Sequence, residues 1–316
     1  MEIINITEID GFEVGQAQDE IGGSGCSVII AKDGAVASVD VRGGAPATRE
    51  TDLLDPVNTV EKIHAVVLSG GSAFGLDAAS GVMQYLEEHD IGFDMQVAKV
   101  PIVCGASLFD LSVGDSKCRP DKQMGYQACL AIGEEVKQGN YGAGTGASIG
   151  KIAGMDKAMK SGLGYYAVKI GDLQVEAIVA INACGDIIDK DNKQQIGGPL
   201  TSDLKLMSTY DLMLSSLALP KGNTTIGCIL TNAILSKAQA KKIASITHNA
   251  YAQTIAPVHT TSDGDTIFVM GSGKVTANLD VIAAIATNVM QTAINSGFKH
   301  AQSAYGLKSW QEINKE

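Results

Sequence analysis

The tripeptide Asn223-Thr224-Thr225 is the part of this chain whose residue types and position are best suited to chemistry. The turn-favouring pair Gly222-Asn223 leads into a β-branched, apolar run, which predicts a strand that begins at or just after Thr224. A hydroxyl at the first position of a buried strand is well placed to attack the carbonyl group before it. Cleavage there would give Thr224 a free α-amino group with a pKa of about 7.7–8.0, so that one residue supplies nucleophile and base. The same residues also fit an ordinary turn that starts a strand.

Two further sites offer groups that could serve such a nucleophile. Asp263 and Asp265 flank Gly264 directly before a predicted strand, where two carboxylates can face one site and hold a proton through mutual repulsion. Asn182, at the end of a predicted hairpin, offers an amide donor suited to an oxyanion. Turns of the Asx-Gly type are also common before strands, and Asn often forms turns at strand ends.

The glycine-rich stretch 139–151 fits several motifs, each incompletely. It partly matches a dinucleotide fingerprint, a nucleophile elbow at Ser148 and the hydrolase pattern Ser148-x-x-Lys151, but the required context or companion motifs are missing. A close-packed loop is an equally good interpretation. Lys151 ends a run of small neutral residues, so it can point into a pocket, although such a lysine is more often solvated.

Composition excludes several classes of function. The 316 residues carry a formal charge of −11, which argues against a nucleic-acid partner because such a partner needs a basic face. Neither a secretory leader nor an apolar run of about 18 residues is apparent, so we expect no membrane span. The six cysteines and five histidines are scattered without metal-ligand or disulfide spacing. We expect a cytoplasmic protein with reduced thiols and no metal site.

Hairpin and helix signals are mixed along the chain. Strands are predicted at 26–31, 35–41, 65–68, 101–103, 165–170, 173–181, 265–270 and from 224, and helices at 75–88, 123–137, 202–217, 237–253 and 278–296. The first two strands are expected to form a hairpin about residues 32–34, and 189–198 is expected to be an exposed loop. This mixture favours an α/β layered sandwich, with sheet packed on sheet and helices outside, over a doubly wound fold. We expect a single domain over residues 1–316.

Six segments, in order over about residues 10 to 300, resemble the peptidase S58 family. They are RETDLLDP at 49–56, LSGGSAFGLD at 68–77, VPIV at 100–103, GAGTGA at 142–147, NTTIG at 223–227 and HTTSDGDT at 259–266. The family includes DmpA-type aminopeptidases, β-aminopeptidases and NylC-type 6-aminohexanoate-oligomer hydrolases. The Asn-Thr junction with Asp-x-Asp downstream resembles the NylC-like branch most.

The resemblance implies an αββα sandwich of the N-terminal nucleophile hydrolase type. It implies a precursor that cleaves itself between Asn223 and Thr224 into the associated fragments 1–223 and 224–316. It also implies a homo-oligomer, often a tetramer, that uses no metal or organic cofactor.

The resemblance also assigns roles to the candidate site residues. Thr224 is the nucleophile, Lys151 handles a proton near its hydroxyl, and Asn182 donates to the oxyanion. Asp263 and Asp265 hold the network and orient the Thr224 amino group. The leading hypothesis is therefore hydrolysis of peptide-like or ω-amino acid oligomer amides through an acyl-enzyme.

One position departs from the NylC-like pattern, in which a tyrosine is expected after the strand at 101–103. This chain has Phe109, whose ring cannot form a hydrogen bond, so activity or specificity can differ. Two alternatives to hydrolysis stay open: an unprocessed relative with a binding role, and acyl transfer from the same acyl-enzyme to an amine. A hydrolase built on Ser148 and Lys151 is the weakest hypothesis.

Overall fold

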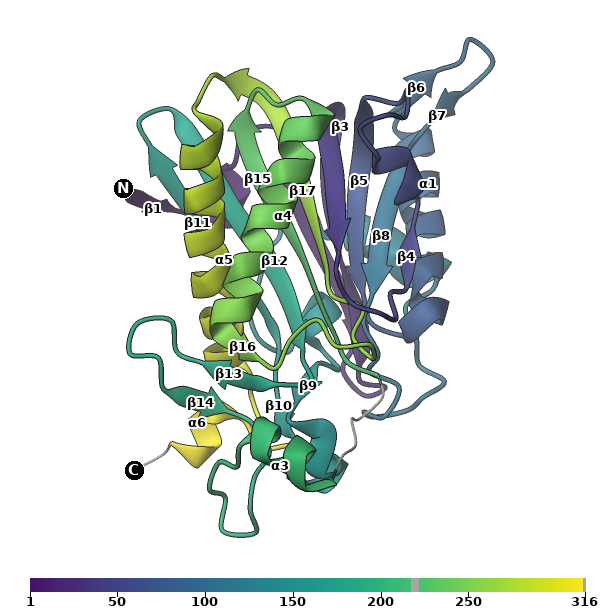
Figure 1. Ribbon diagram of the computed structural model, residues 1–316. Coiled ribbons are helices and arrows are strands. Elements are labelled where there is room, and N and C mark those ends of the chain that lie inside the picture. The colour runs from purple at the N-terminus through teal and green to yellow at the C-terminus, as the bar shows by residue number, and fades with distance from the viewer. Residues whose placement is uncertain (217–221, 315–316) are drawn as a thin grey trace.

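The structure, a computed structural model, describes residues 1–216 and 222–314. Its main sheet has ten strands in mixed parallel and antiparallel pairing, with helices packed on its outer faces (Figure 1). Three large apolar cores separate the layers: one under α4 and α5, one between the two halves of the sheet, and one under α1 and α2. This arrangement confirms the α/β layered sandwich that the sequence predicts.

Strand β3 (Ser24–Val41) connects the two sheet layers. Its first half pairs antiparallel with β2 (Glu13–Asp19) and β5 (Lys62–Ser69), and β8 (Val103–Ser107) extends this layer in parallel beside β5. Its second half pairs antiparallel with β17 (Thr266–Val275), which belongs to the other layer. A strand of 18 residues is long enough to belong to both layers, provided that it bends between them.

The predicted hairpin about residues 32–34 is wrong, because β3 runs through this stretch without reversing. Its register to β5 shifts between Ile30 and Ala35, and Gly34 adopts a left-handed φ of +71°. The polar Lys-Asp-Gly stretch therefore forms a bulge that bends one long strand. A bulge and a hairpin turn need the same local residue types, which is why the sequence alone favoured the turn.

The second layer contains the elements that carry the candidate site. Strands β11 (Leu163–Ile170) and β12 (Leu173–Asn182) form the predicted hairpin, and β15 (Thr224–Ala233) pairs antiparallel with β12 and parallel with β17. Helices α4 (Lys237–Thr254) and α5 (Leu279–His300) cover the outer face of this layer (Figure 1). The strand predicted to begin at Thr224 and the helices predicted at 237–253 and 278–296 are confirmed.

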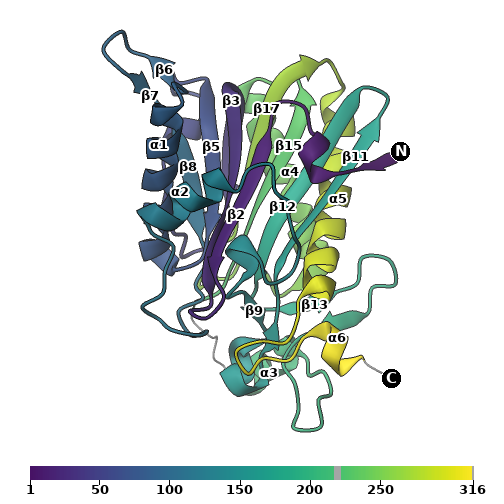
Figure 2. The same ribbon diagram turned by 180° about the vertical axis from the view of Figure 1, so that it is seen from behind.

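Helices α1 (Ala78–Glu88) and α2 (Lys122–Leu130) cover the first layer on the opposite side of the molecule (Figure 2). A 3₁₀ turn over 72–77 precedes α1, so the α-helix starts later than predicted. The predicted helix over 123–137 ends at Leu130, before Gly133, which has a left-handed φ of +95°.

The remaining elements are short. They are β1 (Glu2–Ile4), β4 (Thr48–Arg49), β6 (Phe93–Asp94), β7 (Lys99–Val100), β9 (Ser148–Ile149), β10 (Met159–Lys160), β13 (Asp186–Ile188), β14 (Gln195–Gly197), β16 (Ile255–Ala256), α3 (Thr209–Ser216) and α6 (Trp310–Ile313). The predicted helix over 202–217 is thus confined to α3 among the described residues, and the predicted loop over 189–198 contains β14. The hairpin of β6 and β7 projects from the body in Figure 1. None of the helices within residues 1–216 and 222–314 is long and apolar enough to cross a membrane.

A carboxylic acid is buried in the core between the two halves of the sheet. The Glu176 side chain on β12 is fully buried, and neither carboxyl oxygen has a hydrogen-bond partner among the described residues. Burial raises the pKa of Glu176 well above its usual value, because an unpaired charge is costly in an apolar environment. The folded state therefore holds a proton that the unfolded state releases above a pH of about 4.3, and Glu176 destabilises the fold as the pH rises.

Replacing this carboxylic acid with an apolar side chain is expected to stabilise the protein in a pH-dependent way. Glu176→Met should raise the free energy of unfolding by about 2 kcal/mol at pH 8 and by less at about pH 3, where the acid is protonated in both states. Thermal unfolding at the two pH values measures the difference. An equal change of melting temperature at both pH values would contradict the buried, unpaired carboxyl.

Candidate active site

Strand register brings the start of β15 together with residues from two other parts of the chain. Asn182, the last residue of β12, is the antiparallel partner of Thr224. On the other side of β15, Asn223 forms a bridge with Asp263, and Ile226 pairs with Thr266 at the start of β17. The aspartate pair therefore lies beside the Asn-Thr junction, although about 40 residues separate them in the sequence.

The Thr224 hydroxyl contacts two backbone groups, the Asn223 carbonyl and the Gly264 N–H. It donates a hydrogen bond to the carbonyl oxygen of Asn223, and the Gly264 N–H lies 3.2 Å from both the Thr224 Oγ1 and the Asn223 oxygen. The Thr224 residue is only 4% exposed. A Cβ at Gly264 would lie 2.9 Å from the Thr224 Oγ1, so only glycine lets this N–H approach so closely. The sequence analysis missed this donor, although a glycine between two aspartates marked its position.

Asp265 accepts more hydrogen bonds than Asp263, the other buried aspartate of this site. Its Oδ1 accepts the Thr225 N–H at 2.8 Å, and its Oδ2 accepts both the backbone N–H of His259, at 3.0 Å, and its ring Nδ1–H, at 2.9 Å. Since a carboxylate oxygen only accepts, the ring hydrogen of His259 is on Nδ1. Sequence analysis assigned His259 no role.

Asp263 accepts fewer hydrogen bonds than Asp265. Thr260 donates its backbone N–H to Oδ2 at 2.7 Å, whereas Oδ1 is buried and has no hydrogen-bond partner among the described residues. Burial, and then the nearby charge of Asp265, raise the pKa of Asp263 to about 6. Two neighbouring carboxylates do not readily ionise together, so the pair can hold one proton up to a pH of about 6.

Lys151 reaches the same strand end from the glycine-rich stretch. It begins a 3₁₀ turn (Lys151–Ala153) directly after Gly150, which has a φ of +70° and no room for a Cβ. Its Nζ donates to the Oδ1 of Asn182 at 2.8 Å and to the Asn182 carbonyl at 3.3 Å. The residue is 8% exposed, and burial lowers the pKa of Lys151 to about 7. This lysine points into the protein, whereas most lysines are solvated.

The Asn182 amide is fully engaged in this structure. Its Oδ1 also accepts the Ser148 N–H, at 3.1 Å, and its Nδ2 donates to the carbonyl of Phe109 at 2.9 Å. The Phe109 ring lies against Gly222, where a Cβ would approach it to 2.5 Å. Phe109 therefore lies at the junction, beside Asn182 and the residue that precedes Asn223.

A second buried lysine, which sequence analysis missed, explains how the glycine-rich stretch is held. The Nζ of Lys160 donates to the carbonyl oxygens of Gly144 and Ala147, both at 3.0 Å, and to that of Ser161. These carbonyls converge on one ammonium group that is fully buried. The stretch is therefore a close-packed loop held by Lys160, as one of the two interpretations of the sequence predicts.

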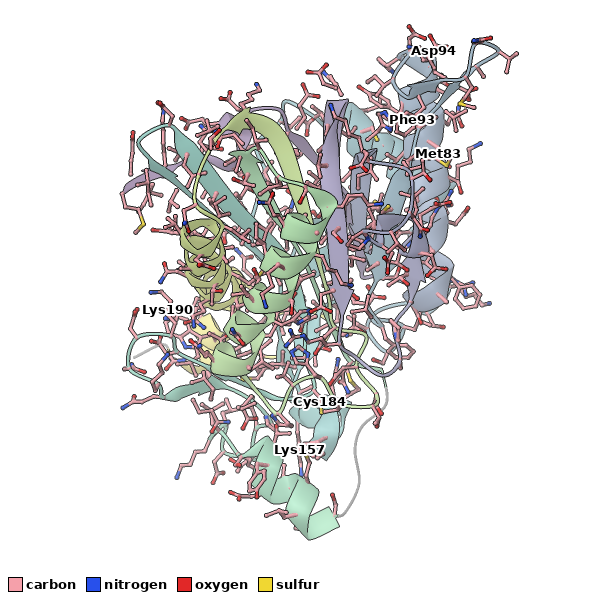
Figure 3. The ribbon with its side chains drawn as sticks, turned by 45° about the horizontal axis from the view of Figure 1, so that its top comes forward. Met83, Phe93, Asp94, Lys157, Cys184 and Lys190 are labelled. Carbon is pink, nitrogen blue, oxygen red and sulfur yellow. The ribbon has the colours of Figure 1, made fainter. Side chains whose placement is uncertain are left out.

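Cys184, which follows Asn182 by two residues and is labelled in Figure 3, lies close enough to Asp263, Lys151 and Asp265 for their charges to act on its thiol. Burial raises the pKa of its thiol to about 12, so it is a neutral neighbour at physiological pH. Among the described residues, no group of three or more histidine, cysteine, aspartate or glutamate side chains could hold a metal ion.

The fold is shared with solved structures of aminopeptidases. The β-aminopeptidase of Burkholderia sp. superposes with a TM-score of 0.71 at 14% identity, over 98% of this chain and 92% of that one. The L-aminopeptidase D-Ala-esterase/amidase of Ochrobactrum anthropi, described as a variant of the Ntn hydrolase fold, gives 0.70 at 17% identity, over 94% and 86%.

Sequence comparison also identifies relatives of this chain. An uncharacterized aminopeptidase of Mycobacterium tuberculosis is 36% identical, over 98% of this chain and 97% of the relative. The 6-aminohexanoate-oligomer endohydrolase of Paenarthrobacter ureafaciens is 31% identical, over 91% and 84%. The model of peptidase family S58 matches residues 5–310. The chain therefore belongs to peptidase family S58.

Proposed function

We propose that this protein is a self-processing amide hydrolase whose nucleophile is the hydroxyl of Thr224. The observation that carries the proposal is the contact of three groups at the start of β15. The Thr224 hydroxyl lies against the Asn223 carbonyl oxygen, and the Gly264 N–H is within 3.2 Å of both oxygens. A nucleophile, the carbonyl that it attacks and a donor for the resulting oxyanion are thus adjacent.

The processing step follows from this geometry. The Thr224 Oγ1 attacks the Asn223 carbonyl carbon, and the Gly264 N–H donates to the oxygen as it becomes an oxyanion. The C–N bond then breaks as the proton lost by the hydroxyl is transferred to the departing nitrogen, which leaves Asn223 as an ester on the Thr224 oxygen and frees the Thr224 amine. Water hydrolyses the ester to release fragments 1–223 and 224–316, which remain associated through β15 in the centre of the sheet.

Proton transfer is assigned to Lys151 and the aspartate pair. Lys151, with a pKa lowered to about 7 by burial, is partly neutral at physiological pH and can accept a proton. It contacts Asn182, the cross-strand partner of Thr224. Once Thr224 is an N-terminal residue, Asp263 and Asp265 are the carboxylates beside it that orient its amine.

The substrate class follows from the family and from the nucleophile. Aminopeptidases and 6-aminohexanoate-oligomer endohydrolases among the relatives both break amide bonds. We infer peptide-like or ω-amino acid oligomer amides as substrates, turned over through an ester on Thr224. Asn182 then supplies its amide to the substrate oxyanion after exchanging its contact with the Phe109 carbonyl. We also propose a cytoplasmic homo-oligomer, a tetramer, built from one domain per chain.

The intact mass of the purified protein tests the proposal. The wild type is expected to give two fragments, of which the second begins at Thr224, and Thr224→Ala is expected to stay whole. Thr225→Val is a matched control, because it removes the adjacent hydroxyl and keeps the backbone N–H that binds Asp265; it should cleave like the wild type. A single full-length mass for wild type after long incubation would favour an unprocessed relative with a binding role.

A second prediction concerns the glycine that supplies the N–H donor. Gly264→Ala places a methyl group 2.9 Å from the Thr224 Oγ1 and 3.1 Å from the Ala45 carbonyl oxygen, so the nucleophile or the donor must shift. Cleavage is expected to slow by about 100-fold, as displacement of a reacting group by about 1 Å does. Gel densitometry of freshly expressed protein over time measures the rate. If Gly264→Ala is cleaved at the wild-type rate, the Gly264 N–H does not take part in the cleavage reaction.

A further inference from the structure

A cluster of three rings, two of them fully buried and the third, that of His259, partly exposed, adjoins the aspartate pair and has no part in the proposed reaction. It consists of His248 and Tyr251 on α4 and of His259 in the loop before β17. The ring centroids of His248 and His259 lie 4.8 Å apart, and that of Tyr251 lies 5.3 Å from His248 and 6.1 Å from His259. Only His259 of the three forms a hydrogen bond to a carboxylate, that of Asp265.

The two aspartates differ sharply in the donors that they receive. Asp265 accepts three N–H groups, two of which come from His259. Asp263 is held by Thr260, and its buried Oδ1 has no partner among the described residues. Hydrogen bonds donated to a carboxylate stabilise its ionised form, whereas burial without donors favours the protonated form. The asymmetry therefore distinguishes two carboxyls that look equivalent in the sequence.

We propose that His259 is a positioning residue that holds Asp265 as the ionised carboxylate, so that the single proton of the aspartate pair resides on Asp263. The position of the proton does not depend on the proposed function. Only its use, which is exchange with the Thr224 amine, rests on that function. Asp265 is then a fixed negative charge, and Asp263 is the member of the pair that gains and loses a proton.

The backbone of His259 supports this role. Its φ is +58°, a left-handed conformation that is uncommon for residues other than glycine but is better tolerated by Asn, Asp and His. This conformation turns the backbone N–H and the ring Nδ1–H of one residue toward the same oxygen of Asp265. The ring is packed against His248, whose Nε2 is fixed by the Asp40 carbonyl at 2.9 Å.

Several other ionisable groups face the aspartate pair or the rings. They are His248 and Tyr251 from α4, Asp40 from β3, Arg42 just after β3, Lys151 from its 3₁₀ turn, and Cys184 after β12. Burial lowers the pKa of His248 to about 4 and raises those of Tyr251 and Cys184, so these three groups are neutral near pH 7. Lys151 is the group that titrates alongside Asp263.

Two substitutions at His259 separate its donor from its backbone conformation. His259→Asn keeps a side-chain N–H near the position of Nδ1 and tolerates a left-handed φ, whereas His259→Gly tolerates the same φ and removes the donor. Both are made in full-length Thr224→Ala, so that processing cannot differ between samples. The aspartate carboxyl carbons are labelled with ¹³C, and their signals are assigned with Asp263→Asn and Asp265→Asn.

The expected result is that, with His259 present, the Asp263 carboxyl signal is the one that changes as the pH passes through about 6. His259→Gly should spread this change over both carboxyl signals, and His259→Asn should confine most of it to Asp263 again. A change confined to the Asp265 signal with His259 present would overturn the proposal. So would a distribution of the change between the two signals that His259→Gly leaves unaltered.

A second measurement needs no variant of His259 and so remains valid if His259→Gly fails to fold. The ¹⁵N signals of the His259 ring should show Nδ1 protonated between pH 6 and 8, and an unprotonated Nδ1 would overturn the proposal. Neither measurement uses enzyme activity, so both stand if the Thr224 hydrolase proposal fails. In active enzyme, the acid limb of the pH profile should move to higher pH in His259→Gly and return in His259→Asn.

Discussion

Replacement of Thr224 by alanine is expected to lower the rate of amide hydrolysis at least about 1,000-fold, because loss of a covalent nucleophile removes the main reaction path. The buried hydroxyl at the start of β15 is the one around which the Asn223 carbonyl and the Gly264 N–H are grouped. Release of free amine from an amide substrate measures the loss.

Covalent labelling separates the role of Thr224 in catalysis from its role in processing. During turnover of a slowly hydrolysed ester, an acyl group is expected on the N-terminal residue of the 224–316 fragment and on no residue of 1–223. Ser148 carries the alternative hydrolase hypothesis, and its backbone N–H shares the Asn182 Oδ1 with Lys151. An acyl group found on Ser148, with Ser148→Ala inactive but normally cleaved, would contradict the role of Thr224.

Lys151 is expected to have the second largest effect. Lys151→Met removes a group that can exchange protons near neutral pH, and it should lower kcat/KM by about 100- to 10,000-fold. The sign of the pH dependence follows from the pKa of about 7: the neutral, proton-accepting form of Lys151 increases as the pH rises through 7. The wild-type rate should therefore rise over this interval.

Arginine at the same position is the informative control. Lys151→Arg keeps a cation that can bind the Asn182 Oδ1, but it does not release its proton at any pH that the protein tolerates. If Lys151 transfers protons, Lys151→Arg should be nearly as inactive as Lys151→Met and should lose the rise near pH 7. Substantial activity in Lys151→Arg would instead mean that Lys151 acts as a fixed charge that positions Asn182.

Local patterns in the sequence were sufficient for the elements with strong periodicity or clear turns. The β11–β12 hairpin about Gly171-Asp172, the strand from Thr224 and helices α4 and α5 follow from residues that are neighbours in the chain. The failures occurred where one local pattern permits two outcomes. Lys32-Asp33-Gly34 fits a bulge as well as a turn, and pairing with both β5 and β17 selects the bulge.

For the candidate site as well, the sequence indicated some of the residues and only the tertiary structure revealed others. Resemblance to a family picked out Thr224, Lys151, Asn182, Asp263 and Asp265, and the structure places them around one strand end, where their roles remain predictions. Sequence analysis identified neither the Gly264 N–H as a donor nor Lys160 as a buried anchor. A backbone N–H becomes a donor at a particular atom only through its position, and a lysine becomes a buried anchor only when carbonyls converge on it.

The sequence by itself determined which residue types are available: a threonine after a turn, two aspartates about a glycine, and a lysine at the end of a glycine-rich stretch. The tertiary structure alone decided that Asp265 accepts three N–H groups, whereas Asp263 accepts that of Thr260. It also decided that Asn182, the cross-strand partner of Thr224, binds Lys151. The physical reason is that donor geometry and burial depend on the register between strands far apart in the chain, and these two quantities set the charge of each group.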